Sequence, residues 1–299
     1  MEMAVENVIH RPKKRFRIKI SAKWCLTYAF MLALVSFTAL PLVYMVSTAF
    51  KPIDELFIFP PRFLVRNPTF YNFTNLLIAV DSSEVPFTRF IFNSIFTTIV
   101  IVSLTVIVSS MGAFALVKYK LPGASLLFSI VIAALMFSPH VTQIPSYMVV
   151  NNLGLLNKYW ALIIPKIAVA YNFFLMKQFI EQLPNEFLES ARIDGAGEWK
   201  IFTAIALPFL RPAWSTLVVF SFVANWNDYF SPLVYITSQS LKTLPLALQT
   251  ISGGAANMSI GRAGAVSAAT FLMTAPTVIV FTIMQAKVME TMAYSGIKA

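Results

Sequence analysis

Long uncharged runs separated by short charged segments dominate this sequence. A helix needs about 20 apolar residues to cross the hydrocarbon core of a bilayer, and a run of about 18 or more with few charges is a candidate span. Six runs meet this criterion, and they are residues 24–50, 90–117, 121–157, 159–179, 213–236 and 263–286. The pattern predicts an all-α polytopic membrane protein with six transmembrane helices and with both termini on one side.

The predicted spans divide the chain into segments. These are a basic N-terminal tail (1–23), a first transmembrane helix (24–50), an external segment (51–89), a core domain with five transmembrane helices (90–288) and a C-terminal tail (289–299). Within the core, the run 121–157 is longer than one span needs. We therefore expect one helix with an irregular end around Pro139 and Pro145.

Lys and Arg residues give the orientation, because cytoplasmic flanks of spans carry an excess of them. The side that holds both termini carries 15, seven of them in the N-terminal tail, and the opposite side carries seven. Both termini are therefore predicted to be cytoplasmic. No cleavable signal peptide is expected, since the first apolar run is long enough to be a span itself.

The composition agrees with a membrane protein. The chain has 299 residues, of which 58% are hydrophobic and 12% charged, with a mean hydropathy of +0.72. A soluble domain is about a quarter charged. The net charge of +10 could suggest nucleic acid, but its concentration in the tail favours a topology signal. One cysteine, Cys25, and two histidines, His10 and His140, exclude a disulfide framework and a thiolate or histidine-pair metal site.

Two external segments are long enough to fold. Residues 51–89 contain KPIDELFIFPPRF and NPTFYNF, rich in Pro and aromatic residues, and are predicted to form a cap on the membrane surface. Residues 237–262 contain LKTLPLALQTISGG and are expected to form a short interfacial element and a loop. Each segment is either a simple connection or a docking face for an extracytoplasmic protein, and the residues alone leave both interpretations open.

Motifs for catalysis and nucleotide binding are absent from the sequence. It contains no G-x-x-x-x-G-K-[ST] phosphate loop, no G-x-G-x-x-G and no H-E-x-x-H. We therefore expect no enzyme activity and no cofactor bound by this chain. Six helices can enclose a pathway alone, but six is also half of a twelve-helix assembly. If the chain transports a solute, the energy comes from an ion gradient or from a separate subunit.

Two ionisable residues, Lys166 and Asp228, lie at membrane depth, where charge is costly and is retained for function. Lys166 is seven residues from Tyr159, about 10 Å along a helix, so it could also snorkel to the surface. Asp228 lies in NWNDYFSP beside Asn225 and Asn227. This cluster is either a satisfied polar kink or part of a solute pathway, and we favour the pathway.

The segment 181–208 differs from the rest of the chain, because five of the 13 acidic residues fall within 181–200 on the predicted cytoplasmic side. Phe187, Leu188 and Ala191 are predicted to line one side of a short helix that begins near Pro184. Gly195 can adopt the positive φ of a sharp bend. A second amphipathic helix follows and is ended or kinked by Pro208. Such a two-helix projection suits docking into a groove of a soluble partner.

This segment resembles the signature of ABC importer permeases, E-A-A-x3-G-x9-I-x-L-P. The matching residues are Glu189, Ala191, Gly195, Ile205, Leu207 and Pro208, and Ser190 departs by replacing an alanine. STAFKPIDELFIFPPRF, NPTFYNF, FNSIF, SSMGAFALVKYKLPG, NWNDYFSPLVY and MAYSGIKA further resemble the maltose-permease type of the carbohydrate branch. The likeness runs from about residue 25 to the C-terminus.

The resemblance implies a type I ABC importer permease fold and a coupling loop, residues 181–208, that seats in an ATPase subunit. The implied docking residues are Glu189, Ser190, Ala191, Asp194, Gly195, Ala196, Ile205, Leu207 and Pro208. By a shorter match, Gly296 in the tail would also contact the ATPases. The charged and polar residues at membrane depth, and not the resemblance, give the predicted translocation pathway, which includes Lys166, Asn225, Asn227 and Asp228.

The resemblance also implies the partners and the location. They are a second homologous permease subunit, two ATP-binding-cassette ATPases that hold ATP and Mg, and a periplasmic solute-binding protein, in the bacterial cytoplasmic (inner) membrane. The expected cargo is a sugar or oligosaccharide, with an alginate oligosaccharide suspected. The alternatives are a related permease for another solute such as a glycerol phosphate, an ion-coupled secondary carrier and a non-transporting scaffold.

Overall fold

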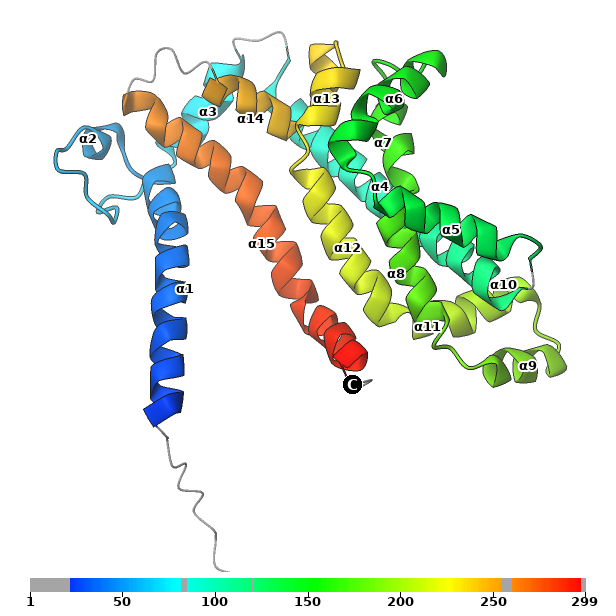
Figure 1. Cartoon of the computed structure of the whole chain (residues 1–299). Helices are drawn as coiled ribbons and strands as arrows, with labels where there is room; N and C mark the ends of the chain where they lie inside the picture. Colours follow the sequence, from blue (N-terminus) through cyan, green and yellow to red (C-terminus); the bar gives the residue numbers. More distant parts are fainter. Residues whose placement is uncertain (1–21, 82–84, 120, 254–259, 297–299) are drawn as a thin grey trace, which may run out of the picture. The chain divides into compact units, whose positions relative to one another are not determined.

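The computed structural model describes residues 22–81, 85–119, 121–253 and 260–296 (Figure 1). All regular secondary structure in these residues is helical. The chain divides into two compact units, residues 1–44 and residues 45–299, and each is described by itself. The predicted basic tail lies outside the described residues as far as residue 21.

The described part of the first unit belongs to α1 (Ala22–Ala49), whose last turns lie in the second unit. Large apolar side chains on several faces of α1 are exposed, among them Leu26 (73%), Leu32 (71%) and Phe37 (77%). A helix that is apolar all round suits lipid rather than water. The composition of α1 is therefore that of a membrane span.

The second unit is built around α4 (Phe87–Lys118). This helix contacts α7 (Tyr159–Ile167), α8 (Ala170–Ile180) and α12 (Arg211–Trp226), and α12 also contacts α15 (Ile260–Gly296). The buried face of α4 is rich in small and hydroxyl side chains, including Ser94, Thr97, Thr98, Thr105, Ser109 and Ser110. Small residues let helix backbones approach closely within a membrane. The sequence of α4 thus suits a central helix with neighbours on several sides.

Both straight helices and bent helix pairs are long and apolar enough to cross a membrane. Three helices are long and apolar enough to cross a bilayer, Lys23–Ala49, Phe87–Lys118 and Ala263–Ala286. Three helix pairs pass the same test together but are bent, by 114° between α5 (Ala124–Leu135) and α6 (Pro139–Asn152), by 40° between α7 and α8, and by 75° before α12. By length and composition, the described residues therefore hold three candidate spans, or up to six if each bent pair is one span.

The prediction of an irregular end around Pro139 and Pro145 was wrong. Pro139 is the first residue of α6, a regular helix of 14 residues that also contains Pro145. A proline at the first helical position loses no hydrogen bond, because that N–H has no partner within the helix. Pro139 therefore begins a new helix at a sharp angle instead of ending the ordered structure.

The segment after α1 folds into a small cap with α2 (Ile53–Leu56) and α3 (Tyr71–Asp81). Buried Glu55 accepts the backbone N–H groups of Arg66 (3.1 Å) and Asn67 (3.0 Å). Buried Asn72 donates to the carbonyls of Ala49 (2.9 Å) and Lys51 (2.7 Å). Side-chain to backbone hydrogen bonds thus hold loops that have no regular structure of their own.

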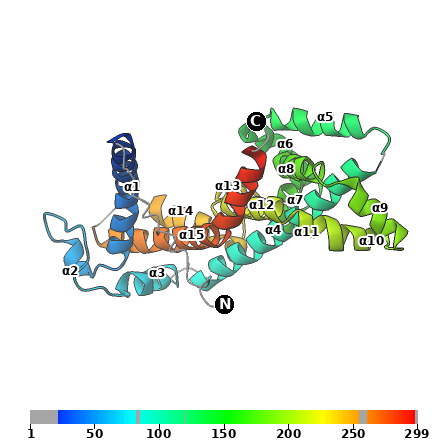
Figure 2. The same ribbon diagram turned by 90° about the horizontal axis from the view of Figure 1, so that it is seen from below.

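The remaining elements lie at the two ends of the second unit. The expected short element and loop after residue 236 contain η2 (Gln239–Leu241) and α14 (Leu244–Gly253), and α13 (Phe230–Tyr235) precedes them. Helices α9 and α10 lie at the opposite end of this unit from α13 and α14 (Figure 1), and Figure 2 shows them at the same edge as the end of α4. Helix α15 continues to Gly296, and residues 297–299 of the predicted tail lie outside the described residues.

Candidate functional site

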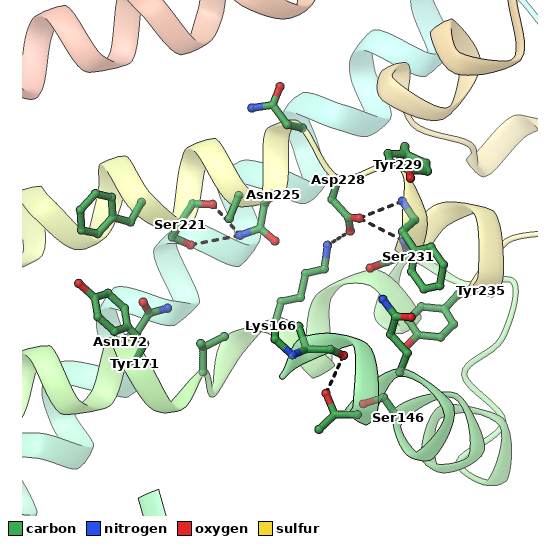
Figure 3. Close-up of a pocket in the computed structure, with 18 residues that line it drawn as sticks. Ser146, Lys166, Tyr171, Asn172, Ser221, Asn225, Asp228, Tyr229, Ser231 and Tyr235 are labelled. Carbon is green, nitrogen blue, oxygen red and sulfur yellow. Dashed lines mark hydrogen bonds and ion pairs between the residues drawn. The ribbon is translucent and has the colours of Figure 1, made fainter. Parts of the chain in front are cut away.

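A cavity of about 530 Å³ opens among α6, α7, α8, α12 and α13 (Figure 3). Its polar side chains are those of Thr142, Gln143, Ser146, Lys166, Asn172, Ser221, Asn225, Asn227, Asp228 and Ser231. Its aromatic side chains are those of Tyr171, Phe220, Tyr229, Phe230 and Tyr235. Ligand sites combine aromatic walls with a few placed polar groups, so this lining suits a small polar solute.

The two charged side chains of the cavity form an ion pair. The Lys166 ammonium points at the carboxylate of Asp228 and bonds to its Oδ2 atom, and the two side chains are 22% and 17% exposed (Figure 3). Since a partner at hand satisfies its charge within the bundle, Lys166 does not need to snorkel. The sequence left open whether Lys166 snorkels to the surface. The contact with Asp228, which is distant in sequence, answers this question.

Both members of the pair lie where a helix is interrupted. Lys166 occupies the last turn of α7, and Ala168 then leaves the helical conformation with ψ 65°. The Lys166 carbonyl, which lies in the last turn of α7, accepts the Thr105 hydroxyl of α4 at 3.2 Å. Asp228 lies between α12 and α13. Interrupted helices line substrate sites in many transporters, because irregular backbone is tolerated where it faces a cavity.

Asp228 is fixed by the start of α13. Its Oδ1 atom accepts the backbone N–H groups of Phe230 (3.0 Å) and Ser231 (3.2 Å), two donors that the first turn of a helix leaves without partners. Asp228 is therefore held by backbone on one oxygen and by Lys166 on the other. The flexible stem of Lys166 makes it the member of the pair that can move.

The two predicted asparagines also line the cavity, and each is anchored to its own helix. Asn225 Nδ2 donates to the Ser221 carbonyl (2.6 Å) and hydroxyl (3.2 Å), and Asn227 Nδ2 donates to the Val223 carbonyl (2.9 Å). The structure thus brings together all four residues predicted for a pathway, Lys166, Asn225, Asn227 and Asp228.

Sequence reasoning missed the other side chains of the cavity. Tyr171 and Asn172 come from α8, and Gln143 and Ser146 from α6. None of these four residues belongs to a local motif, and each lies within an apolar run. Polar residues near the middle of a predicted span were the available signal.

The coupling loop forms the predicted two-helix projection. Helix α9 (Asn185–Ile193) begins after Pro184, Gly195 bends the chain at φ 79°, and α10 (Glu198–Ile201) follows. The second helix continues through a π-helical stretch, η1 (Phe202–Ala206), into α11 (Leu207–Phe209). The break before α12 falls at Leu210, two residues after the proline that was expected to end or kink this run.

The apolar anchor of the coupling loop is shared with the ends of α4 and α8. Leu188, Ile201 and Phe202 are buried in one cluster with Phe114 of α4 and Met176 of α8. The predicted docking residues Ala191, Ala196, Ile205 and Leu207 pack against this cluster. These four therefore hold the projection in place from inside.

The other predicted docking residues face outward. Glu189, Ser190, Asp194, Gly195 and Pro208 are exposed. Phe187, Leu188 and Ala191 were predicted to line one side of a short helix. Leu188 is buried and Ala191 partly buried, whereas Phe187 is 57% exposed, because neighbouring helical positions point about 100° apart. Ile193 (86%) and Trp199 (66%) are also exposed, and neither was among the predicted docking residues.

Two adjacent residues at the end of α4, Lys118 and Tyr119, hold both ends of α9, and we name them the α4 clamp. Lys118 Nζ donates to the Leu183 carbonyl (2.5 Å) and to Asn185 Oδ1 (2.9 Å), at the start of α9. The Tyr119 hydroxyl donates to Glu198 Oε2 (2.5 Å), and Glu198 also accepts Arg192 Nε (2.9 Å) at the end of α9. Burial, followed by the nearby Glu198 carboxylate, raises the pKa of the Tyr119 hydroxyl, which stays a donor at neutral pH.

No metal centre is found among the described residues, since they hold no group of three or more His, Cys, Asp or Glu side chains. The cavity and the coupling loop are the candidate functional elements. Within the second unit the α4 clamp connects the loop to the helix whose Thr105 contacts the Lys166 carbonyl.

The sequence of this chain matches a known family of membrane proteins. The family described as "Binding-protein-dependent transport system inner membrane component" matches residues 106–290. This chain belongs to that family. The match covers the helices that line the cavity and the whole coupling loop, so the predicted resemblance to importer permeases is confirmed.

Relatives and a solved structure agree with the family. Protein LplC of Bacillus subtilis (strain 168) is 36% identical over 220 residues, which cover 72% of this chain and 70% of LplC. "Arabinooligosaccharides transport system permease protein AraQ" of Halalkalibacterium halodurans is 31% identical over 283 residues, which cover 92% of this chain and 96% of AraQ. A chain of "a bacterial ABC transporter involved in the import of the acidic polysaccharide alginate" matches with a TM-score of 0.76 and 23% identity, covering 88% of this chain and 96% of that chain. The predicted all-α importer-permease fold is confirmed.

Proposed function

We propose that this chain is one of two permease subunits of a bacterial ATP-binding-cassette importer, and that it helps to move a saccharide delivered by a binding protein across the inner membrane. Family membership and the AraQ likeness support an importer over an ion-coupled carrier. The observation that carries the proposal is the cavity, where a fixed carboxylate, an ammonium, amides and aromatic rings meet at interrupted helices.

The coupling loop is our candidate for the ATPase contact. Its exposed surface combines the acids Glu189 and Asp194 with the apolar side chains of Phe187, Ile193 and Trp199. A buried apolar anchor with a polar rim is the usual anatomy of a protein interface. The nucleotide and Mg would be held by two ATPase partners, and Gly296 remains a weaker candidate for the same contact.

The rigid attachment of the coupling loop suggests how force would reach the cavity. The α4 clamp and the shared apolar cluster make α9 move with α4, and α4 carries Thr105, which contacts the interrupted end of α7. Closure of the ATPases would therefore shift the α7 end, and with it Lys166, relative to Asp228. The cavity would then open to one side or the other.

The direct test is saccharide uptake by the purified complex in liposomes. We expect the chain to co-purify with a second permease and two ATPase copies. Uptake of a labelled oligosaccharide should require ATP inside the vesicles and the binding protein outside. Uptake that persists without an ATPase and is abolished by a protonophore would contradict the proposal.

A further inference from the structure

The cavity of this chain is electrically balanced, and this bears on which saccharide it can hold. Among the residues that line it, Lys166 and Asp228 are the only Lys, Arg, Asp or Glu side chains, and they pair with each other. The lining therefore has no net formal charge at neutral pH. All its other polar groups are hydroxyls and amides, which donate and accept hydrogen bonds without charge.

The negative member of the pair cannot turn away from a ligand. Asp228 Oδ1 accepts two backbone N–H groups of the first turn of α13, at 3.0 and 3.2 Å. Hydrogen bonds to a carboxylate favour its charged form. The position of Asp228 is thus set by backbone, whether or not Lys166 stays in contact with it.

An anionic ligand would meet an unfavourable field in this cavity. A carboxylate or phosphate that approached Lys166 would also approach Asp228, and like charges at a few ångströms repel strongly where water is scarce. The charge of Lys166 is already compensated by Asp228, so the ligand would add an uncompensated charge to the site.

A neutral polyol meets no such cost. Neighbouring hydroxyl groups of a sugar can accept a hydrogen bond from Lys166 and donate one to Asp228 at the same time, because a hydroxyl is both donor and acceptor. The aromatic rings of Tyr171, Phe220 and Tyr229 offer apolar faces for the C–H surfaces of a sugar ring.

We infer that this chain contributes a neutral-saccharide site to the pathway, and that Asp228 is the residue that excludes anionic sugars. The inference rests on the proposed function and narrows its substrate class. It disfavours uronate oligosaccharides such as those of alginate and phosphate esters such as glycerol phosphate as ligands of this wall. The repulsion between Asp228 and an anionic sugar comes from a side chain of this chain, so single substitutions in this chain can test it.

The test uses pairs of disaccharides that differ only by CH₂OH or COO⁻ at C5, built from glucose, galactose or mannose and their uronates. The complete purified transporter is placed in lipid nanodiscs without the binding protein, so that the selectivity of that protein does not contribute. Binding is measured by saturation-transfer NMR. Wild type should bind the neutral member of at least one pair about tenfold or more tighter than its uronate.

Asp228→Asn is the decisive variant, because the amide keeps an oxygen for the N–H groups of Phe230 and Ser231 while removing the charge. It leaves Lys166 uncompensated and should shift the neutral-to-uronate ratio by about tenfold or more in favour of the uronate. Lys166→Met should shift it further toward the neutral sugar. Glu181→Gln removes the charge of a 43% exposed side chain that pairs with Lys177 outside the cavity, and it should leave the ratio unchanged.

The outcomes separate this inference from the proposed function. A wild-type transporter that prefers the uronate, or an Asp228→Asn variant with the wild-type ratio, overturns the inference while saccharide import stands. Absence of binding to every pair, with ATP-driven saccharide uptake intact, also overturns it, because the cavity is then not the binding site. Absence of both binding and saccharide uptake overturns the proposed function as well.

Discussion

Two ion pairs of this chain, Arg192–Glu198 in the coupling loop and Lys166–Asp228 in the cavity, lie in different surroundings. The first pair has side chains that are 39% and 50% exposed, and the second pair 22% and 17%. An exposed pair contributes about 0–1 kcal/mol, whereas removing one partner of a buried pair costs about 3–5 kcal/mol. The coupling loop therefore depends on its apolar anchor for stability, and the cavity depends on its pair.

The difference in exposure between the two ion pairs fits the tasks proposed for the two regions, which are ATPase docking by the coupling loop and solute binding in the cavity. A docking surface keeps its polar groups accessible to a partner. In the coupling loop, the buried side chains of Leu188 and Ile201 hold this surface rigid. A solute site keeps charges available inside the bundle, so each charge needs a partner when no solute is bound. Substitutions in the cavity and in the coupling loop should therefore impair different properties of the transporter.

The largest effect is expected at the cavity pair. Lys166→Met leaves the fixed Asp228 carboxylate without its ammonium and should cost about 3 kcal/mol in stability. The double variant Lys166→Met/Asp228→Asn has no charge left to compensate and should recover most of the loss. The melting temperature of the purified complex measures both. A double variant no more stable than Lys166→Met would show that the pair is not the source of the loss.

The bend of the coupling loop comes next. Gly195→Val places a β-branched residue at φ 79° and should cost about 1–2 kcal/mol locally, displacing α9 from α10. The matched control is Gly197→Val, because Gly197 has φ −70° and no atom within 4 Å of an added Cβ. Co-purification of the ATPase should fall for Gly195→Val only. Equal retention of ATPase by both variants would contradict this role of the bend.

A smaller effect is expected at the α4 clamp. Tyr119→Phe removes the hydrogen bond to Glu198 and should cost about 1 kcal/mol, roughly fivefold in local opening. Amide hydrogen exchange, read by mass spectrometry, should become faster in α9 and α10. Tyr28→Phe, at an exposed position of α1, is the control. Unchanged exchange in α9 would show that the apolar cluster alone holds the loop.

The smallest effect is a pH dependence confined to the cap. The backbone N–H group of Arg66, together with that of Asn67 and nearby cations, holds the pKa of Glu55 below its ordinary value of 4.5. The stabilisation is therefore present above about pH 4.5 and is lost as the pH falls through the lower folded value. Pepsin cleavage between α2 and α3 should accelerate over that range in wild type. Glu55→Gln, which does not titrate, should lack the acceleration, and a wild type that behaves like this variant would contradict the assignment.

The two regions also differ in how well they could be predicted from sequence. The coupling loop is one contiguous segment, so apolar spacing, Gly195 and the motif predicted its two helices and its bend. Phe187 was predicted on the same side of α9 as Leu188, but it does not share the buried face of Leu188, because adjacent helical positions differ by about 100°. The sequence did not reveal the α4 clamp, because Tyr119 and Glu198 meet only through the packing of α4 against the loop.

The cavity was predicted only in part, because its walls come from five helices spread over residues 139–235. Lys166 and Asp228 were found because a charge within an apolar run is conspicuous. That they pair with each other was not predicted, since nothing in the sequence brings two positions 62 residues apart into contact. The bend between α5 and α6 was missed because the hydropathy of a run does not distinguish a straight helix from a folded one.

The most direct test of the account is the number of saccharide molecules imported per ATP hydrolysed, measured in the same proteoliposomes for wild type, Gly195→Val and Asp228→Asn. We predict that Gly195→Val loses both uptake and the stimulation of hydrolysis by the loaded binding protein. Asp228→Asn should keep stimulated hydrolysis while its uptake of the neutral sugar falls. Full uptake by Gly195→Val, or loss of stimulated hydrolysis in Asp228→Asn with uptake unchanged, would contradict the division of tasks between loop and cavity.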